Sequence, residues 1–321
     1  MLNHLLMQHL YISNFNENTC KKIILFAVPL YLLVLVVWII DPLNYFGQNN
    51  VIPQEKKDSI FADSISDMMT FGAKKKVAVS QTDATCLVIG DSRCVPIDVA
   101  YWYEKKQQKA FNFALAGCFV RSATTSFFFA LDRMQNQPNT VYFGHNFWGL
   151  SDRERFSDID DIGSSPLKYV TSPLTWTLIK EVVLKMNTTN IADKQVDKAS
   201  AFNVWEGWHE IISRKQNLVT TEHIRVQPII YELIDSVANY CERHDIRLIH
   251  VYPPEYKELI AIIQSDSITN AEYQKYLNHL SQYEFYNFNQ GHWIESSNDF
   301  VDPMHPKSHV YNNMIDSIFG D

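Results

Sequence analysis

Residues 84–92, which read ATCLVIGDS, decide the fold class of this chain. The stretch from Thr85 to Ile89 is rich in apolar and β-branched residues, which favours a buried strand. A turn of small and polar residues, Gly90-Asp91-Ser92, follows at once. A buried strand that ends in such a turn is typical of a parallel sheet with a ligand site at its carboxyl edge.

Strand-like and helix-like runs alternate along the rest of the chain. The pattern predicts strands at 110–115, 140–143, 246–252 and, weakly, 285–288, and helices at 95–108, 122–135, 226–241, 255–264, 270–282 and 307–319. This alternation predicts an α/β fold, in which helices cover both faces of a parallel sheet of about five strands.

Four short motifs occur in a fixed order, and three of them lie at or just after a predicted strand. They are Gly90-Asp91-Ser92, Gly117, Gly144-His145-Asn146 and Asp302-Pro303-Met304-His305. Each motif alone is common in ordinary turns. Because the carboxyl ends of parallel strands share one edge of a sheet, the four together predict a single site.

These motifs contain the groups that acyl transfer requires. A serine nucleophile needs a base. We assign Ser92 as the nucleophile and His305 as the base, and Asp302 lies close enough in a turn to orient the imidazole. The backbone N–H groups of Ser92 and Gly117 and the side-chain amide of Asn146 are the expected oxyanion donors. A glycine at position 117 lets the backbone approach closely.

Several residues near the motifs have two readings. Arg93 is expected to bind an acidic group of the substrate or to brace the serine loop by a salt bridge. His145 is expected to line the site or to be structural. His305 and His309 could hold a metal with Asp302, but Pro306 and the lack of a His-Glu-x-x-His pattern argue against it. The tryptophans at 205 and 208 either stack on sugar rings or pack against the sheet.

The chain resembles the SGNH (GDSL-like) hydrolase superfamily through these motifs, over residues 84–149 and 226–321. The resemblance implies a flavodoxin-like three-layer α/β/α sandwich, a Ser-His-Asp triad, and neither metal nor cofactor. It implies an esterase, lipase, carbohydrate acyl esterase or acyltransferase. Two positions depart from the common pattern: Arg93 stands where many members have Leu, and Phe147 where many have Asp.

The N-terminal region carries a membrane signal. Ile23–Ile40 contains no charged residue and no Asn, Gln, Ser or Thr, and at about 1.5 Å per residue it would span roughly 27 Å. Lys21 and Lys22 flank its start, so the positive-inside rule predicts that the large domain is extracytoplasmic. The expected organisation is a cytoplasmic segment (1–22), a transmembrane anchor (23–40), a juxtamembrane linker (41–83) and an SGNH-like domain (84–321) with an insertion at about 150–225.

Composition narrows the choice of partners. The net charge of −8 and the short basic runs exclude nucleic acid as a partner. Five cysteines without a C-x-x-C pair are not a zinc or thioredoxin motif. Cys94 and Cys118 follow two converging motifs, so they are expected either to form a disulfide or to be two buried thiols; Cys20 is expected on the cytoplasmic side.

These inferences predict a single-pass membrane protein with an extracytoplasmic domain. It would be a serine-dependent ester hydrolase or O-acyltransferase that acts on O-acetyl groups of an envelope polysaccharide. The resemblance to membrane-anchored envelope proteins, such as those of alginate O-acetylation and teichoic-acid D-alanine transfer, adds a membrane-bound acyltransferase as an expected partner. The alternative is a non-catalytic envelope protein that binds glycan or an assembly partner. The separation of Ser92 Oγ from His305 distinguishes the two, with about 3.5 Å as the limit for catalysis.

Overall fold

The structure is a computed structural model that describes residues 17–47, 51–53, 56–57, 60–61, 67–150, 165–185 and 207–320. The side chains of residues 17–26, 30 and 67–71 are outside this description. The chain forms two compact units. The smaller unit contains residues 1–65 and 161–191, and the larger one contains residues 66–160 and 192–321.

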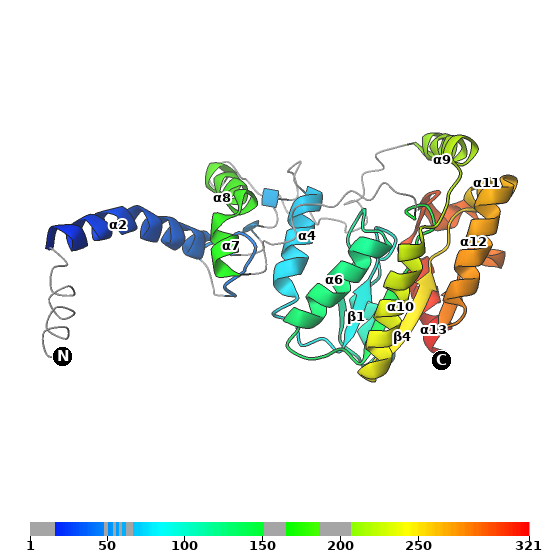
Figure 1. The fold of residues 1–321 in the computed structure, drawn as a ribbon, viewed down its shortest axis with the longest axis horizontal. Helices are drawn as coiled ribbons and strands as arrows, with labels where there is room; N and C mark the ends of the chain where they lie inside the picture. The colour runs from blue at the N-terminus through cyan, green and yellow to red at the C-terminus, as the bar shows by residue number, and fades with distance from the viewer. Residues whose placement is uncertain are drawn as a thin grey trace, which may run out of the picture. The chain divides into compact units, whose positions relative to one another are not determined.

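The larger unit is built on a five-stranded parallel sheet with the order β2-β1-β3-β4-β5. Two of its strands, β1 and β4, are labelled in Figure 1. The strands are β1 (Cys86–Ile89), β2 (Ala110–Asn112), β3 (Thr140–Gly144), β4 (Arg247–Tyr252) and β5 (Phe285–Asn287). The predicted α/β fold with a five-stranded parallel sheet is therefore confirmed. The strand order reverses between β1 and β3, and such switch points are where open α/β sheets bind ligands.

The two faces of the sheet follow from the alternation of side chains along each strand. In β1, Leu87 and Ile89 pack with α6 (Val120–Arg133) and α10 (Pro228–Arg243). Cys86 and Val88 point to the opposite face and pack with α5 (Val99–Lys106) and α13 (Ser308–Phe319). Helices thus cover both faces, because each face presents apolar side chains whose complete burial contributes roughly 1.5–3 kcal/mol apiece.

The larger unit begins at residue 66, upstream of the expected boundary at residue 84. The reason is the helix α4 (Asp67–Ala78), which lies within the expected juxtamembrane linker (41–83). Lys75 Nζ donates to the carbonyl oxygen of Ala114 at 2.6 Å, and Val79, just after α4, is buried with the residues of α6. The end of the expected linker is thus part of the sandwich.

The expected insertion at 150–225 is divided between the two units. Its helix α9 (Trp208–Glu222) packs in the larger unit with α11 (Lys257–Ser265) and α12 (Ser267–Leu280). The end of the larger unit holds two 3-10 turns, η3 (Gly291–Ile294) and η4 (Ser297–Asp299), and the hairpin of β6 (Phe300–Asp302) and β7 (His305–Pro306). This hairpin carries the fourth sequence motif.

The smaller unit contains α2 (Glu17–Ile40), α7 (Pro166–Thr171) and α8 (Pro173–Lys185). Its polar centre is the buried Asp41, whose carboxylate accepts a hydrogen bond from the Tyr169 hydroxyl at 2.7 Å. Lys57, also buried, donates to the carbonyl oxygens of Ile40 at 3.1 Å and Asp41 at 2.8 Å. These donations satisfy backbone acceptors that the end of α2 leaves unpaired.

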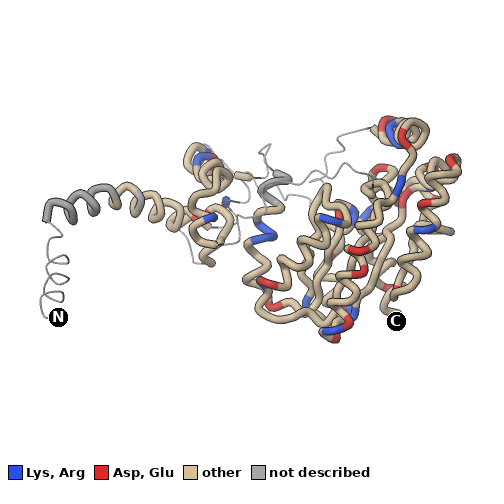
Figure 2. The backbone as a smooth tube through the Cα atoms, in the orientation of Figure 1, with Lys and Arg blue, Asp and Glu red and all other residues tan. Residues whose placement is uncertain are grey.

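The predicted membrane span, Ile23–Ile40, falls within α2. The described side chains of α2 are uncharged (Figure 2), and Tyr31, Leu32 and Trp38 are exposed. Within the described part of the chain, no helix is both long and apolar enough to cross a membrane. Residues 1–16 of the expected cytoplasmic segment, and the side chain of Cys20, lie outside the described residues.

Candidate active site

Ser92, His305 and Asp302 form a continuous hydrogen-bonded series. Ser92 follows the carboxyl end of β1, and its Oγ lies 2.8 Å from His305 Nε2. His305 Nδ1 lies 2.7 Å from Asp302 Oδ2. The first distance falls inside the 3.5 Å limit expected for catalysis, so the structure brings these three residues together.

The Asp302 carboxylate fixes both the backbone turn and the tautomer of His305. Its Oδ1 accepts the backbone N–H groups of Met304 at 2.8 Å and His305 at 3.1 Å. Burial raises the pKa of Asp302. The His305 ring and these two N–H groups lower the pKa by more than burial raises it, so the pKa lies below its ordinary value. An ionised carboxylate can only accept, so the proton is on His305 Nδ1 and Nε2 is free to accept from Ser92.

The expected oxyanion donors differ in how exposed they are. Gly117 is exposed and has a φ of +72°, a conformation that glycine adopts without strain. Its loop is fixed beside the serine loop because the N–H of Leu115 donates to Gly90 O at 3.0 Å. Asn146 is only 5% exposed. Its Nδ2 donates to Asp91 Oδ2 at 2.5 Å, which engages one of the two hydrogens of the amide.

Arg93 has no surface that a substrate could reach, which corrects its assignment as a substrate-binding residue. Its side chain is fully buried. The guanidinium donates to Glu255 Oε1 at 2.5 Å, to Asp91 Oδ2 at 3.3 Å and to the carbonyl oxygen of His145. Burial lowers the pKa of Arg93, but Asp91 and Glu255 together raise it above its ordinary value. Arg93 therefore braces the serine loop, which is the other reading of its sequence position.

Glu255 is a site residue that the sequence analysis missed. It is fully buried, and its Oε2 accepts the indole N–H of Trp148 at 2.8 Å. Burial raises its pKa, and the Arg93 guanidinium opposes that shift. Its position was a usable signal, because Glu255 lies three residues after β4, at the same carboxyl edge as the motifs.

His145 is also removed from substrate, which corrects its assignment as a substrate-binding residue. It is fully buried, with Nδ1 2.7 Å from the Tyr276 hydroxyl and Nε2 2.7 Å from His250 Nδ1. Burial holds the pKa of His145 well below its ordinary value, and the pKa of His250 falls to about 3. Both rings are therefore neutral and serve to join β3 to β4 and α12.

Of the two alternatives for Cys94 and Cys118, the structure shows two buried thiols and not a disulfide. Among the described residues, Cys86, Cys94, Cys118 and Cys241 are all buried thiols that form no disulfide. The Cys94 thiol instead packs on the backbone of the glycines that end β1 and β3: a Cβ added to Gly90 would lie 2.6 Å from Cys94 Sγ, and one added to Gly144 would overlap it. Burial raises the pKa of the Cys94 thiol, which makes it unreactive.

Two other residues with open readings make the following contacts. His309 Nε2 lies 3.0 Å from Asp299 Oδ1, whereas Asp302 is bound to His305. The Trp208 ring packs edge-on against Tyr256, with 5.1 Å between ring centroids. Trp205, the other tryptophan of the pair, lies outside the described residues.

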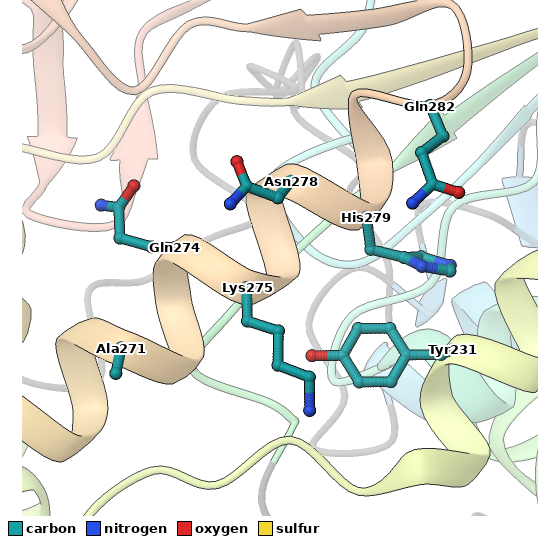
Figure 3. A pocket seen from close by; sticks show the side chains of 7 residues that line it. All are labelled: Tyr231, Ala271, Gln274, Lys275, Asn278, His279 and Gln282. Atoms are coloured by element: carbon teal, nitrogen blue, oxygen red, sulfur yellow. The ribbon is translucent and has the colours of Figure 1, made fainter.

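A surface hollow of about 560 Å³ lies elsewhere, between α10 and α12 (Figure 3). Its lining residues are Tyr231, Ala271, Gln274, Lys275, Asn278, His279 and Gln282. Lys275, His279 and Tyr231 gather on one side of α12 (Figure 3), and His279 Nε2 is paired with Asp235 at 2.7 Å. None of the triad residues borders this hollow, so it is separate from the candidate active site.

Comparison with known proteins gives matches among solved structures. No protein-family model matches the chain, and no curated protein does. A GDSL-like lipase from Bacteroides thetaiotaomicron is 11% identical, with a TM-score of 0.38 over 76% of this chain and 94% of that one.

Two further solved structures match at a similar level. A Streptococcus pneumonia protein described as a platelet activating factor is 9% identical, with a TM-score of 0.41 over 79% of this chain and 91% of its own. A Desulfitobacterium hafniense protein described as lipolytic and of the G-D-S-L family is 10% identical, with a TM-score of 0.35 over 74% and 97%.

At this level of identity, the function of the chain has to be inferred from its own residues.

Proposed function

We propose that this chain is a serine-dependent acyl ester hydrolase or acyltransferase of the SGNH type. The observation that carries the proposal is the series Ser92 Oγ, His305 and Asp302, with 2.8 Å and 2.7 Å between successive groups. A non-catalytic binding protein of the same fold would not need these three groups in register. The geometry therefore favours catalysis.

The chemistry follows from the hydrogen bonds. His305 Nε2 takes the hydroxyl proton as Ser92 Oγ attacks the ester carbonyl carbon. The negative charge that develops on the carbonyl oxygen is stabilised by the backbone N–H groups of Ser92 and Gly117 and by the second N–H of Asn146. The C–O bond then breaks, and His305 returns the proton to the leaving alcohol. Water or a sugar hydroxyl, deprotonated by His305, releases the acyl group from Ser92.

We propose further that the substrate is an O-acylated, chiefly O-acetylated, polysaccharide of the cell envelope. The support is the apolar segment Ile23–Ile40, flanked by Lys21 and Lys22, and the exposed apolar side chains of α2. A single anchor of this kind would hold the larger unit on the extracytoplasmic side, with a membrane-bound acyltransferase as the partner that supplies acyl groups.

The reaction can be tested on the full chain in detergent micelles. We expect turnover of p-nitrophenyl acetate and release or transfer of acetate from acetylated polysaccharides, and none by a Ser92→Ala control. A fluorophosphonate probe should modify Ser92, as mass spectrometry of the labelled peptide would show. If the probe leaves Ser92 unmodified and no ester is turned over, the proposed reaction is refuted.

Location and orientation need a separate experiment. Protease added outside cells with a permeabilised outer layer should degrade the larger unit and spare an N-terminal tag. Carbonate washing should leave the intact chain in the membrane fraction. Complete protection of the larger unit would reverse the proposed orientation, and release by carbonate would remove the anchor.

A further inference from the structure

Two sets of hydrogen bonds meet at residues 255 and 256, just after β4. One set leads to the loop that carries Ser92, and the other leads to the turn that carries Asp302 and His305. Ser92 and His305 lie 213 residues apart in the chain. Contacts between the serine loop and the histidine turn therefore have to fix the distance between Ser92 Oγ and His305 Nε2.

The first set is the buried ion pair between Glu255 and Arg93. Glu255 Oε1 accepts from Arg93 Nη1 at 2.5 Å, and both side chains are completely excluded from solvent. Arg93 directly follows Ser92, and its backbone N–H is bound to Asp91 Oδ1 at 3.0 Å. The position of the Glu255 carboxylate therefore fixes the residues on both sides of Ser92.

The second set passes through the neighbouring residue. The backbone N–H of Tyr256 donates to Pro303 O at 2.8 Å, and Pro303 lies in the turn between Asp302 and His305. The Tyr256 ring also packs on Phe300 of β6, with 5.8 Å between centroids. The backbone N–H of Glu255 itself donates to Asn289 Oδ1 at 2.8 Å. This hydrogen bond joins residues 255 and 256 to the segment that follows β5.

We propose that Glu255 is a positioning residue that couples the serine loop to the histidine turn and so sets the distance between Ser92 Oγ and His305 Nε2. This role rests on the proposed function of the triad. Glu255 does not touch substrate, because it is fully buried. It acts through Arg93 on one side and, through its own backbone and Tyr256, on the other.

The chemistry of the carboxylate explains why glutamate is needed at this position. Two donors, Arg93 Nη1 and Trp148 Nε1, converge on its two oxygens. Glutamine offers one oxygen and one NH₂ group, so one of the donors would face another donor. Aspartate keeps the charge but is one methylene shorter. It would pull Arg93 or the 255–256 segment out of place.

The test compares Glu255→Gln and Glu255→Asp with Glu284→Gln in the full chain. Glu284 is a matched control, because it pairs with Arg247 at the same 2.5 Å but is partly exposed and lies on the β5 side of the sheet. For Glu255→Gln we expect kcat for p-nitrophenyl acetate to fall about 10²-fold, as for a displacement of about 1 Å at a reacting group. KM should change less than twofold. Glu255→Asp should be intermediate, and Glu284→Gln should match the parent.

A second readout does not depend on turnover. The proton on His305 Nδ1, bound between the ring and Asp302, should give a downfield proton resonance that is assigned by its loss in His305→Ala. We expect this resonance to shift or broaden in Glu255→Gln and to be unchanged in Glu284→Gln. If the parent turns over no ester and leaves Ser92 unlabelled, the proposed function fails, but the resonance still decides whether Glu255 positions His305.

The outcomes separate a positioning role from a purely structural one. A Glu255→Gln protein with a lower unfolding temperature but parental kcat and an unshifted resonance would overturn the proposal, since Glu255 would then only stabilise the fold. If Glu255→Gln does not fold, the folded Glu255→Asp variant decides by the same two measurements. Parental values in that variant overturn the proposal, and a lowered kcat with a shifted resonance supports it.

Discussion

The Cys94 thiol occupies the space that a side chain at position 144 would need. A Cβ added to Gly144 would overlap Cys94 Sγ, and a Cβ added to Gly90 would lie 2.6 Å from it. One thiol thus packs over the ends of β1 and β3, where the Ser92 and Asn146 loops begin. The glycine that ends each strand and the cysteine between them form one packing unit.

This packing predicts that Gly144→Ala is destabilising and that Cys94→Ala rescues it. Overpacking of this kind costs about 1–3 kcal/mol. In a Cys94→Ala background the overlapping atom is gone, so the added methyl group should be tolerated. Urea unfolding midpoints of the two single variants and the double variant measure the coupling. Additive losses in the double variant would contradict the proposed packing.

Replacement of either proton-transfer partner should abolish ester turnover without unfolding the protein. Ser92→Ala and His305→Ala should each reduce kcat about 10⁴-fold or more, because groups that act as a unit lose most of the activity singly. The two losses should not add in the double variant. Far-UV circular dichroism and the unfolding temperature check the fold. A Ser92→Ala protein that turns over ester at the parental rate would remove Ser92 as the nucleophile.

Asp302 should affect both activity and acid stability. Asp302→Asn should lower kcat about 10⁴-fold, since it no longer enforces the Nδ1–H tautomer. The folded pKa of Asp302 lies below the unfolded value of 3.8, so its stabilising effect is present above about pH 4 and is lost as the pH falls through the folded pKa. Urea midpoints between about pH 6 and pH 2 should therefore fall less steeply in Asp302→Asn. Parallel pH profiles would contradict this linkage.

Asn146 should matter less than the triad if it is one of three oxyanion donors. We expect Asn146→Ala to lower kcat by about 10²–10³-fold. The variant also removes the donor to Asp91 and the acceptor for the backbone N–H of Trp148, so its unfolding midpoint has to be measured beside kcat. Asn289→Ala, which removes another buried amide at this edge, serves as a comparison for stability. Unchanged kcat in a folded Asn146→Ala protein would exclude Asn146 from the oxyanion site.

The sequence predicts the sheet and the triad because both depend on local signals. The apolar run at Thr85–Ile89 and the turn after it are short-range features, and the order of the motifs follows from the order of the strands. Arg93 and His145 remained ambiguous because their burial depends on partners far along the chain, Glu255 and His250. The choice between a disulfide and two buried thiols at Cys94 and Cys118 stayed open for the same reason, because adjacent loops in the sequence do not establish how two thiols are oriented.

His305, the proposed base, belongs to the shortest strand pair among the described residues of the larger unit. The β6–β7 hairpin is short, with Asp302 paired to His305, and the hydrogen bond from the Tyr256 N–H to Pro303 O joins it to the segment after β4. Local opening of such an element requires less free energy than unfolding of the sheet. Heating should therefore abolish the proposed ester turnover reversibly at temperatures where the circular dichroism spectrum is still native. The temperature range for activity would then be set by a few residues rather than by unfolding of the core.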